Sequence, residues 1–231
     1  MVEVLFNGPA GRIEGVYHKS PSPNAPVALV LHPHPTYGGT MNNKIVYYLY
    51  KTFALNNFSV LRINFRGVGK STGEFSKGAE GLNDAAAAMD WLQSRYNGNM
   101  IYWIAGVSYG AWIAMQLLMR RPEIVNFVSV SPPIGLYDFS FLSPCPTTGL
   151  IIQGDNDNIV KEENVSSLIS QIKAQKSNLI DYYVLHGANH FFDKETDDII
   201  KLLDEYIKKQ MHIFNTTGGI KTDKKRRRLK V

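Results

Sequence analysis

Residues 101–114 read IYWIAGVSYGAWIA. The first five residues form an apolar run typical of a buried parallel strand, and residues 111–119 have a helical pattern. Between them Gly106-Val107-Ser108-Tyr109-Gly110 is a G-x-S-x-G sequence at a turn from strand to helix. Such a turn holds its serine in a strained backbone conformation, and the flanking glycines leave room for the neighbouring strand and helix. The pattern predicts that Ser108 is a nucleophile.

Strand and helix patterns alternate on both sides of this turn. Strand patterns cover residues 2–6, 12–17, 27–31, 60–64, 101–105, 127–130, 150–153 and 182–185. Helical patterns cover residues 42–55, 81–95, 111–119, 162–174 and 197–207. The alternation predicts an α/β fold with a mostly parallel central sheet and helices on both faces. In such a sheet, functional residues lie on the loops that follow the carboxyl ends of the strands.

A base and an acid for Ser108 are expected on two of these loops. A serine hydroxyl needs a base within hydrogen-bond reach, and the loop after the last strand offers His186 and His190. We favour His190, because His186 lies at the strand edge, where a structural role is more typical. The loop after strand 150–153 offers Asp155 and Asp157, and each also fits a turn former or a helix cap.

Donors for a developing oxyanion are expected at two places. The first donor is the backbone N–H of Tyr109, directly after the nucleophile. The second should come from the loop at residues 32–39, where Pro33 and Pro35 have no N–H. His34 is therefore our first choice for the second donor and Tyr37 our second. The candidate pocket walls are Tyr37, Tyr109, Ile134 and Tyr137.

Several of these motifs together resemble a known family. The chain resembles small bacterial α/β-hydrolases related to dienelactone hydrolases and serine aminopeptidases in three features. These are the order Ser108, Asp157, His190 along the chain, the His32-Pro33-His34-Pro35 loop that runs into residues 38–44, and the stretch at residues 64–71. The resemblance covers residues 6–192 and implies the α/β-hydrolase fold. It favours Asp157 as the acid, through the pattern Gly154-x-x-Asp157-x-x-Val160. Dienelactone hydrolases carry a cysteine where this chain has Ser108, which argues against dienelactone as the substrate.

The expected function is that of a serine hydrolase acting on a small acyl substrate through an acyl-enzyme. Esters are the default substrates, and thioesters, amides and N-terminal peptide bonds stay open. Fewer than twenty residues separate Ser131 from the next strand, which is too short for a cap domain. The alternative from another class is a non-enzymatic binding protein of the same fold, and the intact set of Ser108, Asp157 and His190 argues against it.

Composition sets the domain limits and the expected setting. The chain has 231 residues, 44% of them apolar, and its net charge of +5 is concentrated between residues 216 and 231. We expect one folded domain over residues 1–212 and a disordered basic tail over 213–231, which could contact polyanions weakly. A homo-oligomer stays open. The single cysteine, Cys145, and the lack of an apolar run near the ~18 residues of a membrane span favour a cytoplasmic protein.

Two other chemistries were weighed, and we expect neither a cofactor nor a metal ion. Gly69-Lys70-Ser71-Thr72 looks like the end of a phosphate-binding loop, but Asn64 stands where that loop needs its first glycine. His32, His34, His186 and His190 could form a zinc site only with a further ligand, for which the sequence has no candidate at matching spacing.

Overall fold

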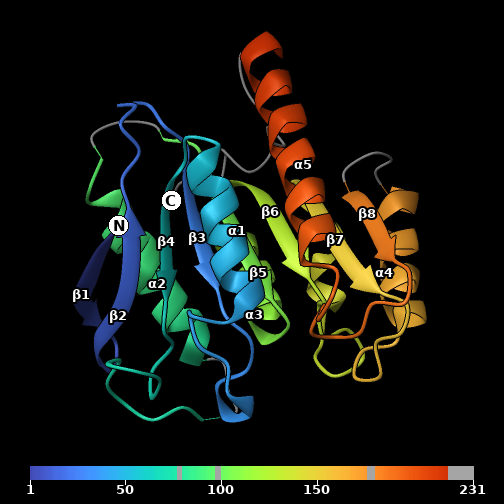
Figure 1. Cartoon of the computed structure of the whole chain (residues 1–231), viewed down its shortest axis with the longest axis horizontal. Coiled ribbons are helices and arrows are strands. Elements are labelled where there is room, and N and C mark those ends of the chain that lie inside the picture. The colour runs from blue at the N-terminus through green and yellow to red at the C-terminus, as the bar shows by residue number, and fades with distance from the viewer. Residues whose placement is uncertain (77–79, 97–99, 176–179, 218–231) are drawn as a thin grey trace.

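The computed structural model describes residues 1–76, 80–96, 100–175 and 180–217. Within them eight strands form one sheet in the order β1-β2-β4-β3-β5-β6-β7-β8. The strands are β1 (Val2–Gly8), β2 (Gly11–His18), β3 (Val27–Leu31), β4 (Ser59–Ile63), β5 (Tyr102–Val107), β6 (Ile124–Val130), β7 (Thr148–Gly154) and β8 (Ile180–Leu185). Strand β2 pairs antiparallel with β1 and β4, and all other pairs are parallel. The carboxyl ends of the parallel strands therefore share one edge, the lower edge in Figure 1.

Helices cover both faces of the sheet. Figure 1 shows α1 (Lys44–Leu55) and α5 (Thr196–Thr217) on the near face, and α2 (Glu80–Gln93) and α3 (Tyr109–Arg120) on the far face. Buried residues of α4 (Glu162–Gln175) join the same apolar cluster as those of α2 and α3. Two short 3₁₀ helices, η1 (Pro35–Tyr37) and η2 (Ser140–Leu142), lie in loops. No helix in the described ranges is both long enough and apolar enough to cross a membrane.

The apolar run of β3 shows why the sheet is central. All five of its side chains are buried. Leu29 and Leu31 belong to the cluster under α2, α3 and α4, whereas Ala28 and Val30 belong to the cluster under α1 and α5. Successive side chains of a strand point to opposite faces, so a strand covered on both sides must be apolar throughout. This arrangement confirms the α/β fold class expected from the sequence.

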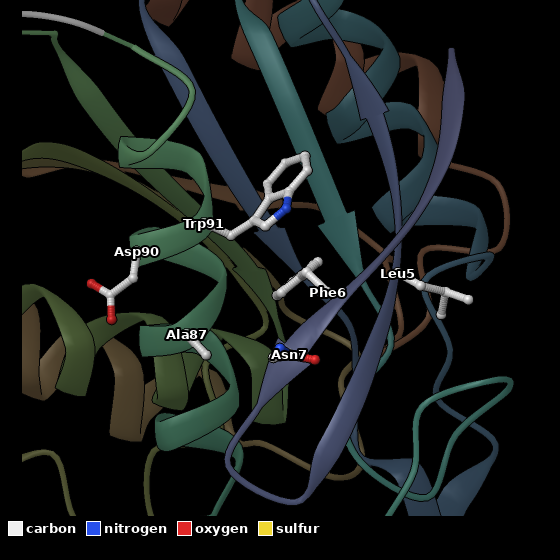
Figure 2. Close-up of a pocket in the computed structure, with 6 residues that line it drawn as sticks. All are labelled: Leu5, Phe6, Asn7, Ala87, Asp90 and Trp91. Carbon is white, nitrogen blue, oxygen red and sulfur yellow. The ribbon is translucent and has the colours of Figure 1, made fainter.

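A shallow groove lies at the outer edge of the sheet, between β1 and α2. Figure 2 shows Phe6 and Trp91 near each other between strand and helix, while Leu5 points away from the helix. The rings of Phe6 and Trp91 stack with centroids 5.2 Å apart, and Leu5 is half exposed. In β1, Phe6 is buried and Val4 is partly buried, whereas Glu3, Leu5 and Asn7 are exposed, which matches the alternation expected of an edge strand with one solvated face.

The segment after β6 and the end of helix α5 bear on the expected absence of a cap domain and on the start of the tail. Residues 131–147 contain only loops and η2, so no cap domain lies over the carboxyl edge there. Helix α5 continues to Thr217, so residues 213–217, which we had assigned to the tail, are helical. Its buried positions Ile199, Leu203, Tyr206 and Gln210 recur every three or four residues, and a helix fixed by such packing propagates into the polar residues that follow. Residues 218–231 lie outside the described part of the chain.

The turn between β5 and α3 depends on close backbone approach. Ser108 has φ 51° and ψ −120°, and its N–H donates to the Val130 carbonyl at 2.9 Å. A Cβ atom on Gly106 would lie 2.3 Å from the backbone carbon and oxygen of Gly110. A Cβ on Gly110 would lie 2.5 Å from the Leu31 carbonyl oxygen. Both glycines are therefore required for helix α3 to approach the sheet.

We predict that Gly106→Ala lowers the free energy of unfolding by about 2–4 kcal/mol, because the methyl group meets backbone that cannot rotate away. Gly187→Ala is the control: no atom lies within 4 Å of the added Cβ, and only the left-handed backbone at φ 75° disfavours alanine, by about 1 kcal/mol. Urea unfolding of both variants measures the difference. Equal losses would show that close approach at Gly106 is not limiting.

Candidate active site

Three side chains from three loops meet at the carboxyl edge of the sheet. Ser108 stands between β5 and α3, Asp157 follows β7, and His190 follows β8. His190 Nε2 lies 3.0 Å from Ser108 Oγ, and His190 Nδ1 lies 2.7 Å from Asp157 Oδ2. Both distances are within hydrogen-bond range. The structure thus brings together the three residues that the sequence singled out, with His190 between Ser108 and Asp157.

Asp157 is buried but well supplied with donors. Its Oδ1 accepts the backbone N–H groups of Ile159 and Val160, each at 2.8 Å. Its Oδ2 accepts Gln153 Nε2 at 3.0 Å in addition to the bond with His190. Burial raises the pKa of Asp157, but the hydrogen bonds from His190 and the backbone amides outweigh it, so the net shift is downward. The carboxylate therefore stays ionised at neutral pH and can hold His190 with its proton on Nδ1.

The competing residues form a separate pair. His186 Nδ1 lies 2.5 Å from Asp155 Oδ2, and the Gly187 N–H donates to Asp155 Oδ1 at 2.6 Å. The Gly187 amide, followed by His186, lowers the pKa of Asp155. The His186 side chain is almost fully exposed, whereas His190 and Asp157 are buried. The structure therefore sorts the two aspartates and two histidines into one buried pair beside Ser108 and one surface pair.

Strained backbone supports the loop that carries His190. Phe192 has φ 50° and a fully buried side chain, so it anchors the loop in the core. Ser131, directly after β6, has φ 45°, and its hydroxyl donates to the His190 carbonyl at 3.4 Å. Non-glycine residues with positive φ cluster at functional sites, where surrounding packing maintains them. Sequence reasoning missed Ser131, because only the folded chain places it beside His190. It also missed Gln153, although that residue stands only four positions before Asp157, because a glutamine in a buried strand carries no motif that marks it as a donor.

A cavity of about 620 Å³ opens above Ser108 and His190. Tyr37, Tyr109 and Tyr137 line it, as expected, but Ile134 does not. Ile134 is partly buried and packs instead against the apolar cluster that includes residues of α2 and α3. The residues that sequence reasoning did not assign to the pocket include Pro133, Leu136, Ile159 and Phe191.

The loop after β3 forms one wall of this cavity. His32 is fully buried, and its Nε2 accepts the Phe65 N–H at 3.0 Å, while Nδ1 contacts the Pro33 carbonyl at 2.6 Å. These contacts require the tautomer with its proton on Nδ1. Burial lowers the pKa of His32 to about 4, so the ring is neutral at physiological pH. His32 thus has a structural role, joining the loop to the end of β4.

The candidate oxyanion donors differ in their placement. Tyr109 is the first residue of α3, where backbone N–H groups point away from the helix and favour negative charge. His34 lines the cavity together with Ser108. Tyr37, our second choice beside His34, is wrongly placed for this role, because its N–H donates to the His34 carbonyl at 3.1 Å. The 3₁₀ turn of η1 uses that amide internally.

Comparison with known proteins agrees with this geometry. Residues 38–146 match the family model described as serine aminopeptidase, S33. An uncharacterised protein of Rickettsia prowazekii is 49% identical, over 100% of this chain and 99% of that protein. A solved structure from Agrobacterium tumefaciens, described as an α/β hydrolase of unknown function, is 51% identical over 91% of this chain and 97% of the other, with a TM-score of 0.89. An α-β serine hydrolase homologue from Coxiella burnetii is 32% identical over 89% and 96%, with a TM-score of 0.81.

The chain belongs to the α/β serine hydrolase family. Its relationship to serine aminopeptidases, stated from sequence motifs, is confirmed by the family match. In this hydrolase the stretch at Gly69 is structural: Lys70 Nζ donates to Glu3, and the Ser71 hydroxyl donates to the Asn64 carbonyl. Within the described ranges, no group of three or more histidine, cysteine, aspartate or glutamate side chains is arranged to hold a metal ion.

We predict that Asp157→Asn lowers ester turnover by several orders of magnitude, because asparagine does not stabilise the imidazolium of His190 and favours the wrong tautomer. Asp155→Asn is the matched control: it alters only the surface pair and should leave turnover within a few-fold, with little loss of stability because water screens that pair. Steady-state kinetics and thermal midpoints decide between them. An active Asp157→Asn beside an inactive, folded Asp155→Asn would contradict the geometry.

We predict a pH-dependent stability contribution from His32. Its folded-state pKa of about 4 lies below the ordinary value of 6.5, so the unfolded chain binds the proton first. Stability should therefore fall as the pH drops from 6.5 to 4, by up to about 1.4 kcal/mol per pH unit from this residue. In His32→Asn this dependence should be weaker, so the stability gap between wild type and variant shrinks toward pH 4. A gap that stays constant would contradict a neutral, buried His32.

Proposed function

We propose that this protein hydrolyses a small ester through an acyl-enzyme, with Ser108 as nucleophile. The observation that carries the proposal is the hydrogen-bonded chain from Ser108 Oγ through His190 to Asp157, with distances of 3.0 and 2.7 Å. His190 Nε2 takes the Ser108 proton as the hydroxyl oxygen attacks the acyl carbonyl, and it then gives that proton to the leaving alcohol. Water, activated again by His190, releases the acid and restores Ser108.

The developing negative charge needs donors at the same place. We propose the backbone N–H groups of Tyr109 and His34 for this role. The first is supported by its position at the start of α3, next to the nucleophile, and the second by its place in the cavity wall. Thioesters and amides share the acyl chemistry. An ester is the default substrate, and its alcohol is a better leaving group than the amine of an amide.

The remaining parts of the chain carry secondary proposals. We propose that the basic segment near the carboxyl end contacts polyanions weakly, since seven lysine and arginine residues stand there against one aspartate. We propose that the protein lies in the cytoplasm, because the sequence contains a single cysteine and therefore no internal disulfide. The non-enzymatic alternative is less favoured, since a binding protein would not need an ionised Asp157 aligned on His190 and Ser108.

Labelling with a fluorophosphonate probe tests the nucleophile directly. We expect wild type to be labelled on Ser108 and to hydrolyse p-nitrophenyl acetate. Ser108→Ala should lose labelling and roughly 10⁴-fold or more in turnover while keeping its thermal midpoint, because the hydroxyl serves chemistry and not packing. His190→Ala should be nearly as severe and His186→Ala mild. A folded wild-type protein that is neither labelled nor active would favour the binding-protein alternative.

A further inference from the structure

The mouth of the cavity has an unusual surface. Four large apolar side chains that line the cavity are also strongly exposed, and we call them the apolar rim: Tyr37 at 86%, Phe191 at 61%, Leu136 at 60% and Ile159 at 47%. They come from the loops after β3, β8, β6 and β7, respectively. Exposed apolar side chains scattered singly need no explanation, but a group gathered around one opening marks a binding site.

The cavity also has a distinctive charge character. Among the described residues that line it, none is an aspartate, glutamate, lysine or arginine. An ammonium group brought into such a site would lose its hydration without gaining a carboxylate partner, at a large energetic penalty. A carboxylate or phosphate group would likewise find no lysine or arginine partner among these residues. The part of the substrate that enters must therefore be neutral, unlike the N-terminal residue of a peptide.

The walls of the site are mostly apolar. Ser108 and His190 present the reacting atoms, and Val107, Ile45 and Pro133 contribute apolar walls. Besides the tyrosines, the other polar side chains in the lining are His34, Thr36 and Asn43. A carbonyl seated at Ser108 leaves the rest of the substrate beside the apolar walls and the rim. Ligand sites generally combine such apolar walls with a few convergent polar groups.

We propose that the apolar rim binds the hydrocarbon chain of a neutral ester whose carbonyl reacts at Ser108. The inference rests on the proposed function and assigns its substrate class: esters with an alkyl or acyl chain of medium or greater length. Continuity of the rim with the cavity favours a single substrate chain as the occupant, because the four side chains surround an opening instead of forming a flat face. Residues 131–147 form no cap over this opening, so the hydrocarbon chain of the bound substrate would bury the rim.

The chain-length profile of p-nitrophenyl esters, acetate to decanoate, tests this assignment below the critical micelle concentration. Complete burial of one methylene group corresponds to roughly a fourfold gain in binding. We therefore expect kcat/KM to rise about two- to fourfold per methylene until the chain passes the rim, where it levels off. Alanine p-nitroanilide, which carries an ammonium group, should be hydrolysed at least about 100-fold more slowly than the best ester.

Variants locate the effect on the rim. Leu136→Ser and Ile159→Ser should each reduce the ratio of kcat/KM for the octanoate and acetate esters by about three- to tenfold, mainly through KM. Leu55→Ser is the matched control: Leu55 is 74% exposed, but it ends α1 just before β4 begins, at the amino edge of the sheet. Its octanoate to acetate ratio should equal that of wild type.

Three results would overturn this proposal and leave the assignment of Ser108 as nucleophile intact. The first is a flat chain-length profile while Ser108 is still labelled. The second is turnover that rises only above the critical micelle concentration, which would indicate that the rim binds a lipid surface. The third is a dimer that Leu136→Ser dissociates, which would make the rim a contact between two copies of the protein. Binding to the inactive Ser108→Ala variant separates the two questions. 1-Octanol should raise the thermal midpoint of Ser108→Ala more than 1-butanol does at equal concentration. In the double variant that also carries Leu136→Ser, the two alcohols should give equal shifts. Equal shifts in Ser108→Ala itself would exclude a rim that binds a hydrocarbon chain.

Discussion

The backbone of Ser108, at φ 51° and ψ −120°, is the constraint on which the site depends. This conformation turns the chain from β5 directly into α3 and leaves the half-buried serine facing the cavity at the sheet edge. It persists only because Gly106 and Gly110 let the helix, β5 and β3 approach within distances that no side chain tolerates. The first amide of α3 is thereby placed next to the reacting hydroxyl, where a developing anion would benefit from it.

The parallel sheet then supplies the partners of Ser108. Strands β5, β7 and β8 end at the same edge, so residues far apart in the sequence meet there as loop neighbours. Burial separates the roles of two similar pairs. Asp157 and His190 are buried, where their hydrogen bond is strong and orients the His190 ring toward Ser108. Asp155 and His186 lie at the surface, where water weakens their interaction. The same two residue types thus differ in chemistry through environment alone.

An uncovered carboxyl edge gives this hydrolase its apolar mouth. With only loops and η2 between Ser131 and β7, the side chains of the surrounding loops line the entrance themselves. Strain at Ser131 and Phe192 holds one of these loops in place, so the opening has fixed walls. A site of this kind recognises substrates by burying hydrocarbon at its entrance and places its few polar groups at the reacting carbonyl.

The sequence by itself determined the layered fold and singled out Ser108 as the candidate nucleophile, because apolar periodicity and the glycine spacing around Ser108 act locally along the chain. It ranked His190 above His186 on placement alone, and Asp157 above Asp155 only with the help of a resemblance. It could not place Ile134 in the core instead of the cavity, since which way a loop side chain points depends on the packing beneath it. Ser131 and Gln153 became visible only in the tertiary structure, as did the gathering of Leu136, Ile159 and Phe191 around one opening. The Ser131 contact and the rim join loops that follow different strands, and no local pattern encodes such long-range neighbours. Gln153 is only four residues from Asp157, but its amide reaches the carboxylate because the turn after β7 folds back on that strand.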